Sequence, residues 1–310
     1  QQVCMFYFML KIMVLAACIA LPFACSDESK KTLPYLDAGA ADVALGDSGS
    51  CAGVSCSGQG TCSVGKAGPA CQCNPGHQAY GLACIKLSQG PVAWWRMDEP
   101  AGAKSAADAS GNGHDGVINA VKTGVNGVLG QAFSFKDGLV TVMPSAKLDK
   151  LSSLSISMWL KPAALPKGPP SGKDFFFIVT RREPPPDGVD TWRVAIGAGS
   201  LAFSAEDESG DQHGTTPRTA LNIDKWNHLV ATFSSMTISL YLDGKRVSSV
   251  AAKRPLKVDT PAKIYLGNNL TLQRGFEGLL DEVRIFDVAL TDAEVKAEYD
   301  ALCPAGACNP

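Results

Sequence analysis

From residue 91 onward, hydrophobic and polar residues alternate in short runs separated by Gly, Asn, Asp and Pro. The clearest runs cover residues 154–160, 192–196, 229–233 and 238–242, and the last of them leads into an Asp-Gly pair. A period of two places successive side chains on opposite faces of a strand, and Asp-Gly favours a hairpin turn. Repeated half-buried strands without helices between them predict antiparallel sheets packed as an all-β sandwich.

One helix is predicted near the end of the chain. Thr291 and Glu294 have the spacing of a capping box, in which two residues satisfy one another's backbone N–H groups at a helix start. Val295, Tyr299 and Leu302 then share one face of the helix. The sandwich is therefore expected to be followed by a single short helix.

The N-terminal segment has the shape of an export signal. Lys11 is followed by an apolar run over residues 12–24 and then by a polar run that Cys25 begins. A cysteine directly after an apolar run resembles a bacterial lipoprotein signal, which implies that Cys25 is lipidated and that residues 1–25 are its signal. Cys18 is the alternative lipidation site, and an ordinary cleaved signal or an uncleaved anchor stays open.

Residues 26–50 contain almost no bulky apolar side chain after Leu36. Such a segment cannot bury enough surface to offset the entropy of ordering the chain. We therefore predict a disordered, flexible linker between the signal and the folded domains. A tether of this kind is expected in a protein that a lipid holds at a membrane.

Cysteine spacing adds a second folded unit. Six of the 11 cysteines fall between Cys51 and Cys84, and none lies between Cys84 and Cys303. Clustering in a short exported segment indicates disulfides and an oxidising compartment, and below about 40 residues such cross-links are usually required for folding. A zinc site is the alternative, which the export signal disfavours. Cys303 and Cys308 predict a further small disulfide loop in the C-terminal tail, residues 303–310.

The order of the cysteine gaps, Gly60 before Cys62 and the pair Cys71-Gln-Cys73 make residues 51–85 similar to an epidermal growth factor-like domain. Calcium-binding members of that family carry an acidic cluster before the first cysteine, and this chain has Asp47-Ser-Gly-Ser50 there, so no calcium is expected in this module. The resemblance implies three disulfides: Cys51–Cys62, Cys56–Cys71 and Cys73–Cys84.

Composition and charge exclude one class of partner. The chain has 310 residues, a formal net charge of −2 and a pI of about 6.1, with no basic block. Nucleic-acid-binding proteins carry a basic patch that attracts phosphates, so no nucleic-acid partner is expected. With 45% hydrophobic and 19% charged residues and 31 glycines, the rest of the chain is typical of a turn-rich globular protein.

The sandwich region contains, in this order, the motifs V-A-W-W-R-M-D-E, D-A-S-G-N-G-H-D-G, S-I-S-M-W-L-K-P, W-N-H-L-V-A-T-F and G-L-L-D-E-V-R-I-F-D. Together they make residues 90–302 similar to the laminin G-like, concanavalin A-like jelly roll. The resemblance implies an antiparallel β-sandwich of two sheets. It does not decide the function, because lectins, adhesion modules and glycosidases share this sandwich.

The last of these motifs, with the residues just before it, brings three carboxylates together: Glu277, Asp281 and Glu282. Asp281 is expected to share a face with three aliphatic residues, whereas Glu282 faces the other way and can pair with Arg284. An ionised carboxylate that faces a core costs several kcal/mol unless it is paired, so Asp281 needs a partner.

Glycosidases of this sandwich class resemble one another in carrying alternating carboxylates on one strand, and the two catalytic groups lie about 5–5.5 Å or about 6.5–9.5 Å apart. Here Glu282 points away from Asp281, and Glu277 lies four residues before it. The chain also shows no nucleophile elbow or metalloprotease motif around its 4 histidines. We therefore predict that the protein is not an enzyme.

Asp281 can instead bind a metal or accept backbone hydrogen bonds. Asp108 and Asn112 lie on a glycine-rich loop and offer the hard oxygen ligands that calcium takes, and similar sandwiches often hold calcium. Asp108, Asn112 and Asp281 are therefore the predicted ligands of a structural Ca²⁺. The alternative is that Asp108 and Asn112 bond to their own turn, and that Asp281 accepts hydrogen bonds from that loop.

Trp159 and Trp192 are the predicted ligand-binding aromatics. Trp159 lies on the serine face of its strand and Trp192 follows a long loop, so either could stack on a sugar ring. Burial is the alternative for both. Trp94, Trp95 and Trp226 are assigned to the core.

The acidic run 205–211 lacks alternating apolar residues and predicts a hairpin loop. His213, just after this loop, is expected to be solvated.

Taken as a whole, the sequence predicts an exported, non-catalytic binding protein that recognises extracellular carbohydrate or protein through the jelly roll. The lipid at Cys25 would attach it to the membrane at the surface of the cell envelope or outer membrane; without the lipid it would be secreted. A glycan hydrolase or lyase on the same sandwich, or a purely structural surface spacer, are the alternatives.

Overall fold

The computed structural model describes residues 50–65, 68–166, 175–184, 188–197, 200–217, 219–269 and 275–303. The predicted signal with Cys25, and nearly all of the predicted linker, lie outside the described residues. Among the helices within the described ranges, none is long and apolar enough to cross a membrane.

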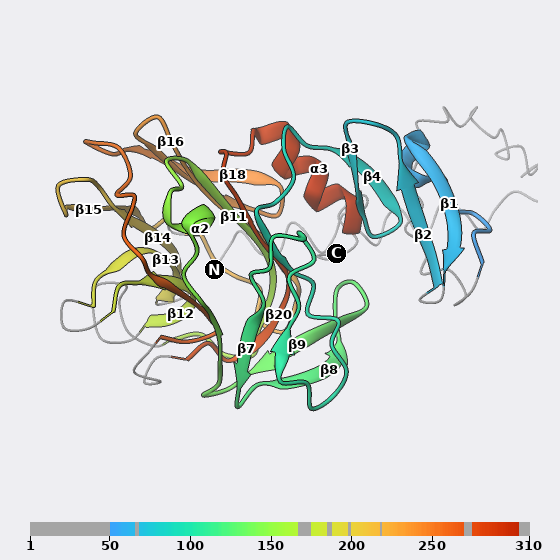
Figure 1. The fold of residues 1–310 in the computed structure, drawn as a ribbon, viewed down its shortest axis with the longest axis horizontal. Coiled ribbons are helices and arrows are strands. Elements are labelled where there is room, and N and C mark those ends of the chain that lie inside the picture. Colours follow the sequence, from blue (N-terminus) through green and yellow to red (C-terminus); the bar gives the residue numbers. More distant parts are fainter. Residues whose placement is uncertain are drawn as a thin grey trace, which may run out of the picture. The chain divides into compact units, whose positions relative to one another are not determined.

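A small disulfide module comes first (residues 51–86; Figure 1). Its secondary structure consists of η1 (Cys56–Gly58), β1 (Gly60–Gly65), β2 (Gly68–Cys73), β3 (His77–Tyr80) and β4 (Ala83–Lys86). The strands form two antiparallel hairpins, β1 with β2 and β3 with β4. Gly60 is needed where it stands, because a Cβ there would lie 2.5 Å from the carbonyl oxygen of Gln72 and 2.8 Å from the sulfur of Cys84.

Three disulfides hold this module together, and they are the pairs that the resemblance implies. They join Cys51 to Cys62, Cys56 to Cys71 and Cys73 to Cys84. Cross-links stabilise so small a unit mainly by restricting the unfolded chain, typically by about 2–4 kcal/mol each. At the other end of the chain Cys303 is also disulfide-bonded, but Cys308, its predicted partner, lies outside the described residues.

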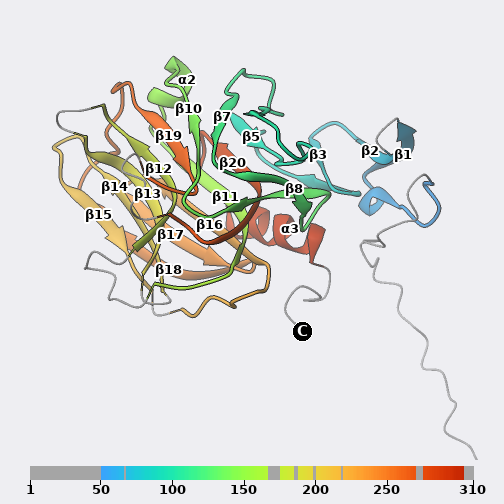
Figure 2. The ribbon, with the colours of Figure 1, turned by 90° about the horizontal axis from the view of Figure 1, so that it is seen from below.

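Two antiparallel sheets form the sandwich, and Figure 2 shows them as facing layers. The β12 sheet contains, in spatial order, β15 (Gln212–Thr215), β14 (Ser200–Glu206), β13 (Asp190–Gly197), β12 (Phe175–Arg182), β19 (Lys263–Leu266), β10 (Leu139–Val142), β7 (Gly116–Asn119) and β6 (Ser105–Ala106). The β11 sheet contains β18 (Lys245–Ala251), β17 (Thr237–Leu242), β16 (Asn227–Ser234), β11 (Leu154–Pro162), β20 (Gly278–Phe286), β9 (Gln131–Phe135) and β8 (Lys122–Asn126). β5 (Ala93–Trp95) also pairs with β20. The predicted all-β antiparallel sandwich is confirmed.

The main hydrophobic core lies between the two sheets. The aliphatic positions of the run 154–160 all face it and are fully buried, as the alternation predicts. Val194 and Ile196 of β13 face them from the other sheet. Burying a side chain of this size is worth about 1.5–3 kcal/mol, so these positions fix the pairing register of both sheets.

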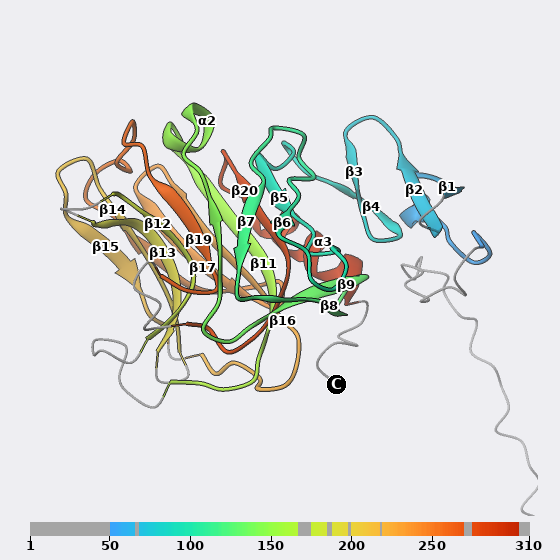
Figure 3. The same cartoon turned by 60° about the horizontal axis from the view of Figure 1, so that its bottom comes forward.

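A second hydrophobic cluster covers the outer face of the β11 sheet. The helix α3 (Asp292–Leu302) begins with the predicted capping box, in which Thr291 Oγ1 accepts from the backbone N–H of Glu294 and the Glu294 carboxylate accepts from that of Thr291. Val295 and Leu302 of α3 pack against Tyr80 and other apolar residues of the disulfide module, and Figure 3 shows α3 beside these strands. The helix and the module therefore bury this part of the outer face together.

A β-bulge interrupts the pairing of β11 with β20. Trp159 lies opposite Asp281 and Ser157 opposite Arg284, so Met158 faces two residues instead of one. Glu282 adopts the left-handed conformation that the extra residue requires (φ 52°). The predicted orientation of Asp281 is therefore wrong, because the bulge turns it outward, to the side of Trp159.

Candidate functional site

Glu282 of β20 belongs to a buried ion network and not to a cleft. Glu282 accepts a hydrogen bond from the Trp94 indole at 2.8 Å and pairs with Arg284 at 2.9 Å, which confirms the predicted Glu282–Arg284 pair. Arg284 also pairs with Glu298 of α3 at 3.1 Å. The Ser157 hydroxyl donates to the second oxygen of Glu298 at 2.7 Å. The strand and the helix are thereby joined by charged groups.

This network is closed to any outside molecule. The guanidinium of Arg284 lies 3.7 Å from the ring centre of Tyr80 and 4.3 Å from that of Trp94. Glu282, Arg284 and Glu298 are at most 3% exposed. Burial raises the pKa of Glu282 and of Glu298, although Arg284 acts in the opposite direction. These carboxylates therefore hold the fold together and cannot reach an external substrate.

Asp281 supports the turn between β8 and β9. Its Oδ2 atom accepts hydrogen bonds from the backbone N–H groups of Val128 (2.8 Å) and Leu129 (3.1 Å). Burial, and next the neighbouring Glu282, raise the pKa of Asp281 well above its usual value. The turn requires glycine at position 127, because a Cβ on Gly127 would lie 2.4 Å from the same Asp281 oxygen.

Asp108 organises its own loop. It accepts hydrogen bonds from the backbone N–H groups of Trp94 (3.0 Å), Ser110 (2.9 Å) and His114 (2.9 Å). Burial acts to raise the pKa of Asp108, but these hydrogen bonds outweigh it and lower the pKa. Asn112 donates to the carbonyl oxygen of Val92 at 2.9 Å, and its own oxygen accepts from Lys147 at 3.0 Å.

The three predicted calcium ligands are thus not joined into one set. Asp108 and Asn112 both bond to Ser110, whereas Asp281 shares no partner with either of them. Asp281 also bonds to the turn at Val128 and not, as the alternative had it, to the loop that holds Asp108. Each side chain instead has protein donors or acceptors of its own, although the Oδ1 atom of Asp281 is buried with no hydrogen-bond partner in the described part of the chain.

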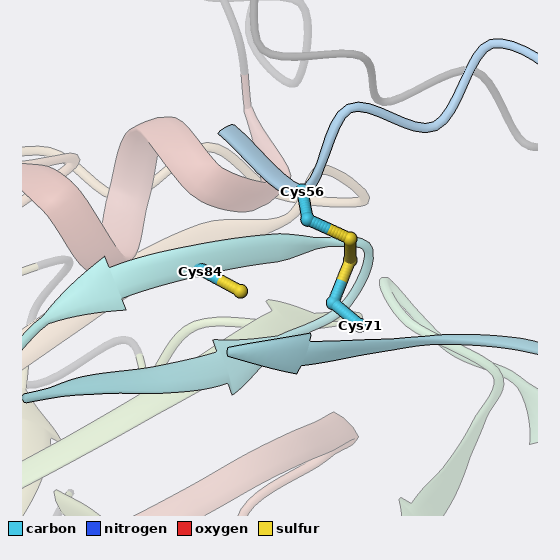
Figure 4. Close-up of side chains that lie close together, drawn as sticks. All are labelled: Cys56, Cys71 and Cys84. Carbon is cyan, nitrogen blue, oxygen red and sulfur yellow. A yellow bond between two sulfur atoms is a disulfide. The ribbon is translucent and has the colours of Figure 1, made fainter. Parts of the chain in front are cut away.

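Among the described His, Cys, Asp and Glu side chains, one group has ligand atoms close enough to share a metal ion: Cys56, Cys71 and Cys84. Figure 4 shows the sulfur of Cys84 next to the Cys56–Cys71 disulfide. Cys84 is itself bonded to Cys73. Because a metal binds the thiolate form of cysteine, these oxidised sulfurs form a packed disulfide pair and not a metal centre.

The two predicted ligand-binding tryptophans are buried, and that prediction is wrong. Trp159 is fully buried, donates to the Tyr80 hydroxyl at 2.8 Å and stacks on Tyr299. It does lie on the outer face of its sheet, but the disulfide module and α3 cover that face. Trp192 faces the main core and is 2% exposed. Neither ring can stack on a ligand.

His213 is paired and not solvated. Its Nε2 atom lies 2.7 Å from Asp207 Oδ2, and the Asp207 side chain is fully buried. Asp207 also accepts from the hydroxyl and the backbone N–H of Ser209 and from the backbone N–H of Asp211. The acidic run is a hairpin loop, as predicted, but it is built around one of its own carboxylates.

A groove of about 310 Å³ lies on the part of the outer face of the β11 sheet that α3 and the module leave open. We call it the hydroxyl groove. Its lining carries mostly hydroxyl groups, from Thr232, Ser234, Thr237, Ser239, Tyr241 and Thr291. Arg246, Asp292, Ala289 and Leu290 complete the lining. A volume in the range of about 300–1,000 Å³ is typical of small-molecule sites.

Strand pairing aligns the hydroxyls in a row across four strands. Ser155 lies opposite Thr232, Thr232 opposite Ser239, and Ser239 opposite Ser249. Neighbouring strands are about 4.7–4.9 Å apart, so the row repeats at that spacing. Ser239 donates to Ser249 at 3.1 Å. The Thr232 hydroxyl has no hydrogen-bond partner in the described part of the chain, and its side chain, 4% exposed, lines the groove.

A charged pair stands at one end of the groove. Arg246 Nη2 lies 2.5 Å from both carboxylate oxygens of Asp292, and the Tyr241 hydroxyl donates to Asp292 at 2.8 Å. The hydrogen bond from Arg246, and then that from Tyr241, lower the pKa of Asp292. The side chains of Arg246 and Asp292 are 45% and 60% exposed. The groove therefore offers a fixed donor fork and an ionised acceptor beside its hydroxyls.

Sequence reasoning missed this site, although its signal is present. Thr232 alternates with core-facing residues in one predicted strand, and Ser239 and Tyr241 do so in the next. The outward positions of alternating strands are normally just solvated, so hydroxyls there carry no signal of their own. Only the pairing of the strands turns them into one row.

Comparison with known proteins identifies similar folds. Residues 134–296 match the family model described as the concanavalin A-like lectin/glucanases superfamily. Among curated proteins, none matches the chain in sequence. The binding domain of Paraclostridial mosquitocidal protein 1 is 16% identical with a TM-score of 0.54, over 69% of this chain and 52% of that one.

Two further solved structures have bound partners. The binding domain of botulinum neurotoxin DC in complex with rat synaptotagmin II is 17% identical (TM-score 0.52), over 68% of this chain and 51% of that one. Domain 4 of AbnA, a GH43 extracellular arabinanase from Geobacillus stearothermophilus, was solved in complex with arabinotriose. It is 18% identical with a TM-score of 0.53, over 67% of this chain and 98% of that one. The chain spans about half the length of the toxin domains. At these identities the likeness concerns the fold alone.

Proposed function

The chain belongs to the concanavalin A-like lectin/glucanase superfamily, and from this premise we propose that it binds extracellular carbohydrate, without cleaving it, at the hydroxyl groove. Membership leaves lectin and hydrolase equally open. The observation that carries the proposal is that the opposed hydroxyls of Thr232 and Ser239 line one groove together with a paired arginine and aspartate.

Sugar hydroxyls both donate and accept hydrogen bonds, and so do the hydroxyls of Thr232 and Ser239. Arg246 supplies donors in a planar fork, and Asp292 supplies an ionised acceptor. Ala289, which is only partly buried, offers a small apolar surface for the C–H face of a sugar ring. A neutral sugar therefore finds complementary groups along the groove.

Two observations favour binding over hydrolysis. Glycosidases use two carboxylates on either side of the sugar, and Asp292 is the only carboxylate among the residues that line the groove. The carboxylates Asp281 and Glu282 of β20 are fully buried. Domain 4 of AbnA, a similar sandwich, is described with arabinotriose bound, which supports a sugar ligand. The toxin domain with synaptotagmin II makes a protein ligand the second possibility.

The test is affinity electrophoresis of the full chain in gels that contain neutral polysaccharides, arabinan among them. We expect Thr232→Val together with Ser239→Ala to weaken binding about tenfold, because each lost hydrogen bond is worth about 0.5–1.5 kcal/mol. Thr61→Val, in the disulfide module, is the matched control and should bind as the wild type does. Retardation that the double variant retains in full would contradict the proposal.

The disulfides and the extracellular-type domain indicate an exported protein. We further propose that a lipid on Cys25 holds it at the surface of the cell envelope. Metabolic labelling with a palmitate analogue tests this, with Cys25→Ser expected to lose the label and Cys18→Ser to keep it. If Cys18→Ser loses the label and Cys25→Ser keeps it, Cys18 is the lipidated residue.

A further inference from the structure

A second hollow, of about 440 Å³, lies where β20 begins. We call it the charged hollow. Four charged side chains line it, two basic and two acidic: Lys136, Lys161, Asp224 and Glu277. Phe135 and Leu279 are among the apolar residues of its lining. Its residues are distinct from those of the hydroxyl groove.

Backbone hydrogen bonds fix the segments that build this hollow. Ala163 donates its backbone N–H to the carbonyl oxygen of Glu277 at 2.9 Å, and Asp224 donates to that of Pro162 at 2.8 Å. Gly278, the first residue of β20, has φ 150°, and a Cβ there would lie 2.3 Å from the carbonyl oxygen of Lys161. Lys161 is therefore placed by β11 itself. Lys136 directly follows β9, Glu277 directly precedes β20, and Asp224 is tied to β11 through the carbonyl oxygen of Pro162.

Cross-strand pairing adds a second constraint. Leu279 lies opposite Ser134 of β9 on one side and opposite Lys161 of β11 on the other. Directly opposed residues share one face of a sheet. The apolar side chain of Leu279 is thus held between a hydroxyl and an ammonium group on the outer face.

The charges in this hollow do not neutralise one another. None of the side chains of Lys136, Lys161, Asp224 and Glu277 makes an ion pair within 4.0 Å in the described ranges of the chain. Opposite charges that share a hollow without pairing leave room for a ligand that contacts both kinds of group. Such a ligand carries an anionic group for the lysines and hydrogen-bond donors for the carboxylates.

We propose that the charged hollow binds a uronic acid residue of an acidic polysaccharide. The ammonium groups of Lys136 and Lys161 would hold the sugar carboxylate by charge-assisted hydrogen bonds. Asp224 and Glu277 would accept hydrogen bonds from ring hydroxyls, and Leu279 would contact the C–H face of the ring. This site is separate from the hydroxyl groove, and the proposal does not depend on that groove binding a sugar.

The carboxylates of the hollow favour a sugar over simpler anions. A phosphate or sulfate group brings negative charge without hydroxyl donors, so Asp224 and Glu277 would only repel it. An acidic peptide has hydrogen-bond donors on its backbone, but none on the side chain that bears the carboxylate. A uronic acid joins a single negative charge to several hydroxyls on one ring, which matches two ammonium groups set beside two acceptors.

The test uses isothermal titration calorimetry on the full chain with polygalacturonate, neutral arabinan and polyglutamate as probes. We expect polygalacturonate to bind, and to bind less tightly as salt is raised, because surface charges are screened. Lys136→Gln and Lys161→Gln should each weaken this binding about tenfold, as the loss of a hydrogen bond to a charged group implies. Lys86→Gln, in the disulfide module, makes the same charge change elsewhere and should bind normally.

Three outcomes would overturn the proposal. Polygalacturonate that does not bind at all removes its basis, and an equal loss in Lys86→Gln would show attraction by net charge alone. Polyglutamate that binds as tightly as polygalacturonate would show that charge, and not a sugar, is recognised. The variants at Lys136 and Lys161 should leave arabinan binding and the melting temperature unchanged, so that failure of the hydroxyl groove and of this hollow can be told apart.

Discussion

The hydroxyl of Tyr80, in the disulfide module, accepts a hydrogen bond of 2.8 Å from the indole nitrogen of Trp159, on the outer face of the β11 sheet. Both side chains are almost completely buried. The Tyr80 ring also covers the guanidinium of Arg284 at 3.7 Å. One residue of the module thus satisfies an indole donor and a buried cation of the sandwich, so the two parts are expected to unfold together.

Tyr80→Phe should destabilise the protein by about 1–3 kcal/mol, because the indole N–H of Trp159 is left buried without an acceptor. For a protein of this size that is a fall in melting temperature of about 2–4 °C per kcal/mol. Tyr299→Phe is the matched control: it keeps the ring stacked on Trp159 and removes a hydroxyl that has no hydrogen bond among the described residues. Equal melting temperatures for both variants would contradict the coupling.

Asp281→Asn should change how stability depends on pH. The pKa of Asp281 is raised by burial in the folded state, so its contribution to stability is present below the unfolded pKa and is lost as pH rises through the folded pKa. The amide cannot ionise, so the free energy of unfolding of the variant should rise relative to that of the wild type as pH rises from about 4 to 8. Denaturant midpoints measure this, with Asp259→Asn, 64% exposed, as control. If the wild type instead becomes more stable than Asp281→Asn as pH rises, the folded protein favours the ionised form of Asp281.

Calcium should not act through Asp108, Asn112 and Asp281 as one set, because each of these side chains bonds to protein groups of its own segment or of a different turn. Thermal melts of the full chain in excess calcium and in chelator measure this. An ion at a hundred times its dissociation constant adds about 2.7 kcal/mol, a shift of several degrees. A calcium-dependent shift that Asp281→Asn abolishes would contradict the hydrogen-bonded arrangement.

The fold followed from the sequence where local rules decide it. The run 154–160 alternates, and its aliphatic residues do face the core because a strand has a period of two. Thr291 and Glu294 are three residues apart and do cap a helix. The predicted concanavalin A-like sandwich is confirmed by the family match over residues 134–296. Each of these features depends on neighbours in the sequence or on several motifs at once.

The site depended on contacts between distant segments, and there the sequence was insufficient. Trp159 was correctly placed on the outer face, but strand periodicity does not reveal that Tyr80 covers that face. The bulge at Glu282 turns Asp281 to the other face of the sheet. In this bulge β20 has one residue more than the paired segment of β11. The row through Thr232 and Ser239 appears only after the strands are paired. These relationships are tertiary, so no local pattern carries them.

Asp207 and His213 give the last prediction, which concerns the hairpin loop between β14 and β15. Hydrogen bonds to Asp207, first that from the Ser209 hydroxyl, outweigh its burial and lower its pKa well below the usual range. A carboxyl whose pKa is lowered on folding contributes stability above its unfolded pKa, and that contribution is lost as pH falls through the folded pKa. Asp207→Asn should therefore lower the denaturant midpoint at pH 7, and the difference from the wild type should shrink below about pH 4.

Asp211→Asn, in the same loop, is the control. Asp211 bonds to Asp207 only through its backbone, so the midpoint of this variant should stay close to that of the wild type. A gap that is constant between pH 7 and pH 3 would mean that Asp207 does not act through its charge.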